Sequence, residues 1–362
     1  MIRRPNRKEE RIAEMNITKK GDLRVLAYRV SPDGGIPEGV LIIYMRSGRA
    51  ERIVFEREDQ VRIGDVYLAR VKSTNPETGG AFLDIGGKKT AFMNYGGKKN
   101  IYVINREYDG TLKPCDELAV RVRDLERGDK KLRVIFASDV PATEYEHKKA
   151  PCILHIAKSA FDKSIRDVLE EESALWLTED AGIYEKTVSV TESGDLRNGR
   201  DRIKLYSDQD ISMNALYDVR AALSRITARR IHLPGGAEIV IDRTEAMTVI
   251  DVNSASGRKV HMSGDSHGSS TALAINSEAA EEIAYQIDAR NIGGMILVDM
   301  LKMKDAESES ILLKQMNEML GSLNPPAHAE DITKLGIAEI VRAKCGEDIY
   351  QLKTVLDKTI LA

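Results

Sequence analysis

The sequence predicts a multi-domain protein of mixed α and β structure that contains a small antiparallel β-barrel. Its 362 residues are enough for two or three domains, each with its own core. Short runs of β-branched and aromatic residues, separated by Gly-Gly, Asn-Pro and Gly-Asp turn signals, fill residues 62–133 and are typical of a barrel. A strand–helix–strand pattern follows in residues 246–299 and is typical of a parallel α/β unit.

The composition is that of a soluble globular chain. Hydrophobic residues make up 42% and charged residues 31%, and no apolar run approaches the roughly 18 residues of a membrane helix. The basic start of the chain has no apolar stretch like that of a signal peptide. The three cysteines are too far apart for a disulfide framework or a Cys-x-x-Cys metal site. We therefore expect a reduced, cytoplasmic protein without a membrane partner.

The segments around the barrel predict further strands and helices. Residues 22–57 predict strands separated by the Gly/Pro-rich turn at residues 31–39. A polar linker is expected at residues 141–151, and residues 152–180 begin with an apolar strand and continue at helical spacing. Residues 213–229 predict one amphipathic helix.

The barrel segment is basic, although the whole chain has a formal net charge of −3. Residues 62–133 hold 15 Lys and Arg against 10 Asp and Glu, a local charge of +5 that leaves −8 for the rest. A Gly-Gly-Lys-Lys turn places Lys88 and Lys89 near Phe82 and Phe92 on the predicted strands. Cations that bind phosphates, beside rings that stack on bases, are what single-stranded nucleic acid binding needs. The spacing alone also allows both phenylalanines to belong to the barrel core.

Residues 238–242 and 246–252 predict a hairpin, and a helix and a short buried strand follow it. Asn276 or Ser277 is the expected N-cap of that helix, and the Gly-Gly pair after it is expected to end it. The buried strand ends at Asp299. Because a crossover helix usually joins parallel strands, the two strand ends are expected at one edge of a sheet.

Polar side chains stand at both of these strand ends. Asp251 and Asn253 project on one face of the first strand, and Asp299 ends the second. Two carboxylates without a thiolate or imidazole close in sequence suit an oxygen-seeking cation such as Mg²⁺, which is commonly shared with a substrate phosphate. The alternative is structural: Asp251 and Asn253 form an Asx-type turn, and backbone amides hold Asp299.

Two segments of the chain closely resemble the signature of the ribonuclease E/G family of endoribonucleases. They read LPGGAEIVIDRTEAMTVIDVNS and NSEAAEEIAYQIDARNIGGMILVDM. GDVYLARV with GGAFLDIG, DRIKLYSD and DITKLGIAEIVR extend the resemblance over most of the chain. It implies a ribonuclease-H-like subdomain with an inserted OB-fold β-barrel, followed by a DNase-I-like catalytic subdomain. The expected boundaries are 1–60 for the N-terminal part of the ribonuclease-H-like subdomain, 61–138 for the OB fold, 139–232 for the remainder of the first subdomain and 233–362 for the DNase-I-like subdomain.

The resemblance also implies roles for individual residues. Asp251 and Asp299 are the implied catalytic Mg²⁺ ligands, with Mn²⁺ as a substitute, and Asn253 is implied to assist at the scissile phosphate. The barrel is implied to contact single-stranded RNA. Its candidate RNA-binding residues are Phe82, Phe92 and Lys130, together with Lys88 and Lys89 on the basic turn.

The chain departs from the family pattern at several places. The family's Asp-x-x-Asp reads Asp299-Met-Leu-Lys302, and the loop after Asp251 is longer and partly rewritten, which bears on rate or metal affinity. The segment of the 5′-end sensor is missing around residues 139–150, which predicts indifference to a 5′ phosphate. The Cys-Pro-x-Cys zinc-link motif is absent, so no zinc is expected, and a homodimer would form without it.

The expected function is that of a Mg²⁺-dependent endoribonuclease in RNA processing or decay. It would cleave single-stranded RNA with a metal-activated water and leave 5′-phosphate and 3′-hydroxyl ends. The alternative is a non-catalytic RNA-binding or ribosome-associated protein on a decayed nuclease scaffold, with Lys302 paired with Asp299 in place of the metal. A different metal-dependent phosphohydrolase would need a DNA or small-molecule substrate.

Overall fold

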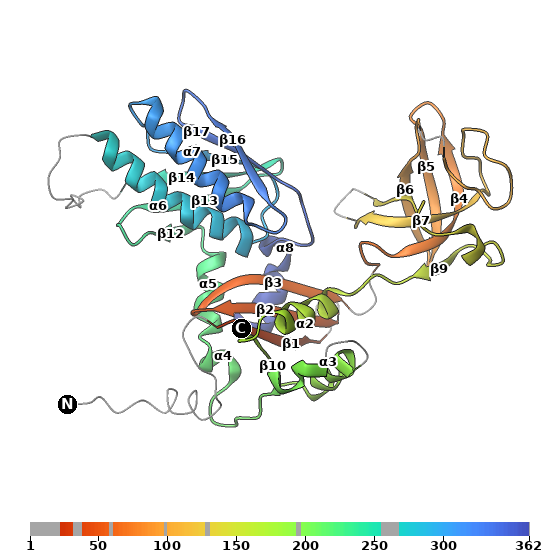
Figure 1. Cartoon of the computed structure of the whole chain (residues 1–362), viewed down its shortest axis with the longest axis horizontal. Coiled ribbons are helices and arrows are strands. Elements are labelled where there is room, and N and C mark those ends of the chain that lie inside the picture. The colour runs from red at the N-terminus through yellow and green to blue at the C-terminus, as the bar shows by residue number, and fades with distance from the viewer. Residues whose placement is uncertain are drawn as a thin grey trace. The chain divides into compact units, whose positions relative to one another are not determined.

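The computed structural model describes residues 22–31, 38–57, 61–97, 100–126, 131–192, 197–254 and 268–361. The chain forms two compact units (Figure 1). One unit is Asp59–Ser159, and the other joins Met1–Glu58 to Ala160–Ala362. The first is therefore an insertion in the second.

The unit Asp59–Ser159 contains a closed five-stranded β-barrel. Its strands are β4 (Val66–Asn75), β5 (Gly80–Gly86), β6 (Lys89–Asn94), β7 (Glu117–Asp124) and β8 (Leu132–Phe136). They follow one another in the order β4-β5-β6-β8-β7, and β7 pairs with β4 to close the barrel. All these pairings are antiparallel except that of β6 with β8. This arrangement is consistent with an OB fold, and it confirms the predicted barrel.

The barrel unit continues past residue 138, where we expected the OB fold to end. A sixth strand, β9 (Cys152–His155), pairs antiparallel with β4. The segment between, with the 3₁₀ helix η1 (Ala142–Glu144), is polar and largely exposed as expected, but it packs against the barrel. Tyr145 and Ala150 are buried there in one cluster with apolar residues of β4, because this segment covers one side of the barrel.

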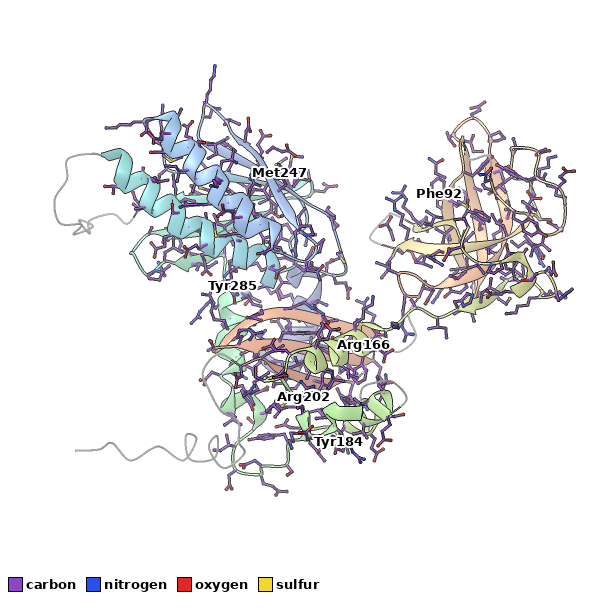
Figure 2. The ribbon with its side chains drawn as sticks, viewed as in Figure 1. Phe92, Arg166, Tyr184, Arg202, Met247 and Tyr285 are labelled. Atoms are coloured by element: carbon purple, nitrogen blue, oxygen red, sulfur yellow. The ribbon has the colours of Figure 1, made fainter. Side chains whose placement is uncertain are left out.

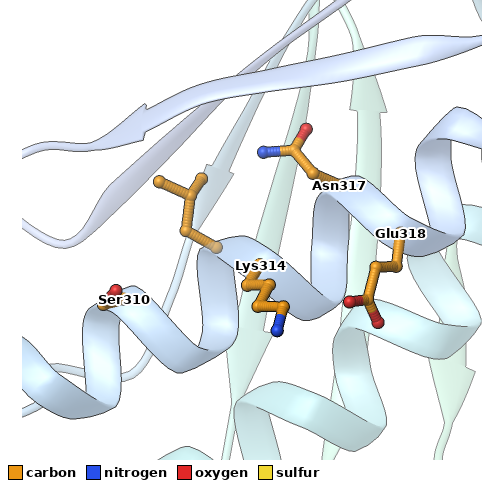
Figure 3. Close-up of a pocket in the computed structure, with 5 residues that line it drawn as sticks. Ser310, Lys314, Asn317 and Glu318 are labelled. Carbon is orange, nitrogen blue, oxygen red and sulfur yellow. The ribbon is translucent and has the colours of Figure 1, made fainter.

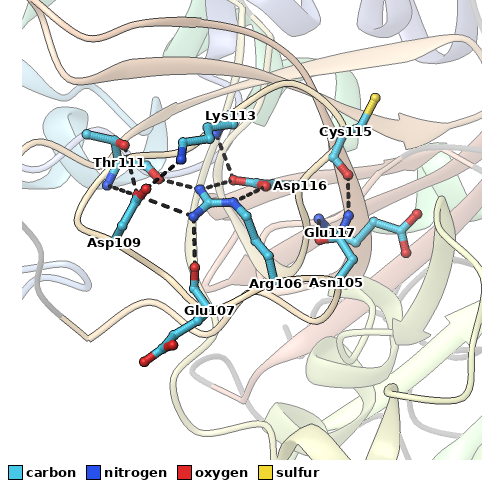
Figure 4. A network of polar contacts seen from close by, with 9 residues as sticks. All are labelled: Asn105, Arg106, Glu107, Asp109, Thr111, Lys113, Cys115, Asp116 and Glu117. Carbon is cyan, nitrogen blue, oxygen red and sulfur yellow. Dashed lines mark hydrogen bonds and ion pairs between the residues drawn. The ribbon is translucent and has the colours of Figure 1, made fainter.

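The described residues of the connection between β6 and β7 (95–97 and 100–116) contain no helix or strand, and one arginine organises them (Figure 4). The Arg106 guanidinium donates two hydrogen bonds of 2.7 Å to the buried carboxylate of Asp116, and a third to the carbonyl of Thr111. Asp109 accepts from Lys113 and Thr111, and these hydrogen bonds hold the pKa of its carboxyl well below the ordinary value. A forked pair of charge-assisted bonds of this kind fixes a loop more firmly than neutral contacts would.

The larger unit contains two sheets, and the first has five strands. They are β1 (Arg24–Val30), β2 (Gly39–Arg46), β3 (Arg49–Arg57), β10 (Leu175–Thr178) and β11 (Ile203–Leu205). The order is β11-β10-β1-β2-β3, with β1, β2 and β3 antiparallel and β10 parallel to both β1 and β11. The strands predicted in residues 22–57 are therefore confirmed.

Helices cover both faces of this sheet. One face packs against α2 (Ala160–Glu170) and α3 (Ala181–Glu192), and the other against α4 (Met213–Leu216), α5 (Val219–Thr227) and α8 (Ile349–Leu356). The 3₁₀ helix η2 (Arg197–Arg202) precedes β11, and the π-helix η3 (Asp357–Leu361) follows α8. The single helix expected at residues 213–229 is wrong, because Asp218 adopts a left-handed backbone conformation (φ 52°) that separates α4 from α5.

The second sheet has six strands, and helices of the described residues cover one of its faces. Its strands are β12 (Arg230–His232), β13 (Glu238–Arg243), β14 (Met247–Asn253), β15 (Gly294–Asp299), β16 (Ala327–Ile332) and β17 (Ile337–Arg342). The order is β12-β13-β14-β15-β17-β16, and only β14 and β15 pair in parallel. The predicted β13–β14 hairpin is confirmed. Because β12 pairs with β13, this sheet begins shortly before residue 233.

Two helices, α6 (Gly268–Ala289) and α7 (Ala306–Gly321), pack on the covered face (Figure 1). The expected start of α6 at Asn276 or Ser277 is wrong. The helix begins at Gly268, and Leu273 and Ile275 pack against the core of the sheet. This tertiary packing outweighs the weak helix propensity of the Gly- and Ser-rich segment.

The two sheets of the larger unit are joined through α6. Arg49 on β3 forms an ion pair of 2.7 Å with Glu282 and stacks 3.8 Å from the ring centroid of Tyr285, whose position Figure 2 marks. The Tyr285 hydroxyl donates to the carbonyl of Ala50 at 2.7 Å. The crossover helix is thus anchored to the first sheet while it connects two strands of the second. None of the helices in the described ranges combines the length and apolar character required to cross a bilayer.

Candidate functional site

The two aspartates predicted from the sequence lie directly opposite each other. β14 and β15 are adjacent and parallel, and their register pairs Asp251 with Asp299. Neighbouring strands are about 4.8 Å apart, so the two carboxylates stand at one edge of the sheet. The hairpin before β14 and the crossover helix after it produce this arrangement, as the sequence predicts.

Both side chains lie on the face of the sheet that α6 and α7 leave open. The burial of β14 alternates, with Ile250 and Val252 in the core and Asp251 and Asn253 half-buried on the other face. Asn253 Nδ2 donates a hydrogen bond of 2.7 Å to Asp251 Oδ2. Asn253 therefore orients one carboxylate and leaves its own amide oxygen for another partner.

The Asp299 carboxylate is exposed and points away from the core at the end of β15. Within the part of the chain that the structure describes, no backbone amide and no cation is paired with it. Lys302 is also exposed, and no ion pair joins it to Asp299 within the same ranges. The alternative that backbone amides hold the Asp299 carboxylate is therefore wrong for the described residues.

The donor set fits a small hard cation. Among the described residues, no three His, Cys, Asp or Glu side chains converge as a metal site, so the pair stands alone. Mg²⁺ typically takes one or two carboxylates and completes its coordination with waters and substrate phosphate, whereas structural zinc takes four protein ligands. Asp251 and Asp299, with the amide oxygen of Asn253 beside them, meet the first description.

The second candidate surface is an aromatic pair on the barrel. Phe82 on β5 and Phe92 on β6 are partners across the strands, with ring centroids 5.4 Å apart and planes at 59°. Their sequence neighbours on both strands form the barrel core, and Phe82 is 41% exposed. The alternative that both rings belong to the core is therefore wrong; Figure 2 marks Phe92 on the barrel.

A glycine makes room for the Phe92 ring. A Cβ at Gly80 would lie 2.9 Å from Cε2 of Phe92 and 3.1 Å from its Cζ. Real Cβ atoms do not approach a ring so closely, so any larger residue would displace it. Gly80, the first residue of β5, is thus part of the aromatic surface.

Cations surround this pair, and the sequence had revealed only some of them. Lys88 and Lys89 are exposed at the β5–β6 turn, as expected, whereas Lys130 lies outside the described residues. Arg133 on β8 is exposed and is the register partner of Phe92. Lys72 on β4 lies 3.2 Å from the Thr90 hydroxyl and 3.5 Å from Asp84.

The sequence did not indicate that Arg133 and Lys72 lie near the aromatic pair, because only the register of the strands shows which residues are neighbours. The alternation of β8, in which Leu132 and Val134 face the core, indicates only that Arg133 points outward, and the register alone places it beside Phe92. Strands two and three are the usual binding face of an OB fold, and β5 and β6 hold those places here.

Comparison with known proteins agrees with the resemblance seen in the sequence. The model of the Ribonuclease E/G family matches residues 123–345, more than half of the chain. Ribonuclease E of Synechocystis is 35% identical over 144 residues, which are 40% of this chain and 21% of that protein. Ribonuclease E of Escherichia coli is 28% identical over 55% of this chain and 18% of its own length. A putative ribonuclease E of Buchnera aphidicola is 26% identical over 57% of this chain and 49% of its own length.

The aligned parts thus span half or less of the length of these relatives. Within this chain, the family match includes β14, α6 and β15 in full, and with them Asp251, Asn253 and Asp299. The chain belongs to the ribonuclease E/G family.

Proposed function

We propose that this protein is an endoribonuclease that cleaves single-stranded RNA at a Mg²⁺ site formed by Asp251 and Asp299. The observation that carries the proposal is the register of β14 and β15, which sets the two carboxylates side by side on an open face. Membership of the ribonuclease E/G family and relatives named ribonuclease E support the same activity.

The side chains at this edge have separable tasks. Asp251 and Asp299 would hold the cation, and Asn253 keeps Asp251 oriented through its 2.7 Å hydrogen bond. The amide oxygen of Asn253 remains available to a water or to the scissile phosphate group. When bound, Mg²⁺ would activate a water and stabilise negative charge on the phosphate, so that cleavage leaves 5′-phosphate and 3′-hydroxyl ends.

The barrel surface provides the affinity for unpaired RNA. Phe82 and Phe92 offer rings on which bases stack, and paired bases in a duplex have no free face for this contact. Lys88, Lys89 and Arg133 are placed to bind phosphates around the rings. These groups favour single strands over duplexes without reading their sequence.

The fold supports a matching assignment of subdomains. We assign the five-stranded sheet with α2, α3, α4 and α5 to a ribonuclease-H-like subdomain, the barrel to an OB fold and the six-stranded sheet with α6 and α7 to a DNase-I-like subdomain. The mixed order of the first sheet, three antiparallel strands followed by two parallel ones, supports the first assignment. The three cysteines are free thiols, which supports a cytoplasmic location.

The test is a cleavage assay with the full chain and an unstructured, fluorescently labelled oligoribonucleotide in Mg²⁺. Asp251→Asn and Asp299→Asn should each slow cleavage by about 100-fold or more, because charge stabilisation by a bound metal is worth several kcal/mol. Both variants should still bind the oligonucleotide. The matched control is Glu339→Gln, which removes an exposed carboxylate next to Leu297 on the neighbouring strand β17 of the same sheet.

Cleavage by wild type and Glu339→Gln, and its loss in both aspartate variants, would support the proposal. Equal cleavage by wild type and Asp299→Asn would refute it. A wild-type chain that binds RNA but does not cleave it would favour the non-catalytic alternative.

A further inference from the structure

Asn276 of α6 is a fully buried polar residue whose side-chain amide is hydrogen-bonded to both backbone groups of one residue. Its side chain is 0% exposed. Asn276 Nδ2 donates to the carbonyl of Leu301 at 2.8 Å, and the Leu301 amide donates to Asn276 Oδ1 at 3.0 Å. Instead of capping the helix, Asn276 pairs with Leu301 as a neighbouring strand would.

Leu301 lies two residues after the end of β15, so its hydrogen bonds to Asn276 help to fix the end of that strand. Asp299 is the last residue of β15, and the Met300 amide donates to the carbonyl of Gly336 at 3.1 Å. Met300 and Met303 are both buried in the core. The chain after Asp299 is thus held by one backbone bond, by Asn276 and by two buried side chains.

The two carboxylates of the candidate site are positioned by different means. Asp251 receives a hydrogen bond from Asn253, but within the described ranges no side chain is bonded to Asp299. The location of Asp299 therefore depends on the backbone of β15 and on what holds the end of that strand. Loss of the Asn276 amide would leave the N–H and C=O of the half-buried Leu301 without these partners and loosen this end of β15.

We propose that Asn276 is a positioning residue that keeps Asp299 in register with Asp251 for divalent-cation binding. This inference rests on the proposed function of the two aspartates. Groups behind the direct ligands of a metal typically change its affinity 10- to 100-fold when they are removed. Asn276 acts through the backbone and does not touch the cation or RNA.

The chain contains a matched control for this contact. Asn317 of α7 donates from Nδ2 to the carbonyl of Ala329 at 3.0 Å, and the Ala329 amide donates to Asn317 Oδ1 at 2.8 Å. Figure 3 shows Asn317 on its helix. Ala329 lies on β16, the edge strand, which β17 separates from β15. Replacing Asn317 removes the same pair of bonds from the same sheet without releasing β15, the strand that carries Asp299.

The experiment compares Asn276→Ala and Asn317→Ala in the full chain, with wild type and Asp299→Asn as references. Mn²⁺ binding is titrated by electron paramagnetic resonance, which needs no turnover. The Mg²⁺ concentration for half-maximal cleavage, the RNA affinity in EDTA and the thermal unfolding midpoint are measured in parallel.

We expect Asn276→Ala to raise the Mn²⁺ dissociation constant and the half-maximal Mg²⁺ concentration about 10-fold, with cleavage recovering at saturating Mg²⁺. RNA affinity should not change. Asn317→Ala should lower the unfolding midpoint and leave both metal values at those of wild type. If Asn276→Ala does not fold, Asn276→Ser is judged by the same criteria.

Wild-type metal affinity in a folded Asn276 variant would overturn the inference. So would an equal loss of affinity in Asn317→Ala, since that would mean general loosening of the sheet. If Asp299→Asn abolishes Mn²⁺ binding and cleavage while Asn276→Ala changes neither, only the positioning role fails. If Asp299→Asn itself changes neither, the proposed function fails as well.

Discussion

Replacing Phe82 tests whether the aromatic pair on the barrel binds bases. Phe82 is 41% exposed, and its outward face has no contact with the barrel core. Phe82→Ala removes the more exposed ring of the pair and leaves Phe92 on its glycine support. Phe82→Leu keeps apolar volume at the same place but removes the flat ring, so it separates stacking from simple apolar contact.

The size of the effect follows from the geometry. Stacking of a base on an aromatic side chain is worth about 1–3 kcal/mol. The planes of the two rings are tilted by 59° and do not form one continuous platform, so we expect one base to stack on each ring. We expect Phe82→Ala to weaken RNA binding about 5- to 30-fold, which corresponds to about 1–2 kcal/mol, the lower part of the stacking range. Its cost in folding stability should be about 1 kcal/mol, since the side chain is only partly buried.

The assay is fluorescence anisotropy with a labelled, unstructured oligoribonucleotide in EDTA, which prevents metal-dependent cleavage. Ile63→Ala is the matched control, because Ile63 has the same exposed fraction of 41% and lies before the start of β4, away from the rings. Phe82→Ala and Phe82→Leu should both lose affinity, and Ile63→Ala should keep it. Unchanged binding by folded Phe82→Ala, or an equal loss in Ile63→Ala, would refute the stacking argument.

Two further predictions concern charged groups. Arg133→Ala should weaken RNA binding and lower the slope of log K against log salt by about 0.7, the value for one phosphate contact to a single strand; an unchanged slope between 50 and 200 mM salt would exclude that contact. Arg46 donates two hydrogen bonds of 2.8 Å to the carboxylate of Glu171, and they lower the pKa of that carboxyl below its ordinary value of 4.5. The pair therefore stabilises the fold fully above pH 4.5, and this contribution is lost as the pH falls through the lowered pKa of Glu171. Arg46→Gln should therefore lower the free energy of unfolding in urea at pH 7 by at most about 1 kcal/mol, because both side chains are about one-third exposed. The difference in unfolding free energy between the variant and wild type should narrow below pH 4.5. A difference that stays constant with pH would contradict this prediction.

The carboxylate pair was predictable because its causes are local and topological. An alternating strand set the face of Asp251, and the crossover helix made β14 and β15 parallel neighbours. These rules need no knowledge of distant contacts. The same reasoning was unable to detect Arg133, because a register between strands that are far apart in sequence has no local signal.

The aromatic pair shows a different limit. Phe82 stands between Ala81 and Leu83, and Phe92 between Ala91 and Met93, so all positions are apolar and alternation does not tell which face is inside. Closure of the barrel decides it, because the small and aliphatic neighbours fill the narrow interior. The prediction of the start of α6 was wrong for a related reason. Asn276 has the right chemistry for a cap, and only the position of Leu301 reveals that its amide is used elsewhere.

The insertion of the barrel between β3 and α2 has a consequence for biosynthesis. β1 lies between β2 and β10 in its sheet, yet β10 begins only at Leu175. At about 5–20 residues per second, a ribosome needs roughly 6–24 s to pass from Arg57 to that strand. The barrel, Asp59–Ser159, is synthesised completely in that interval. The whole barrel unit is thus synthesised before β10, the parallel partner of β1, becomes available.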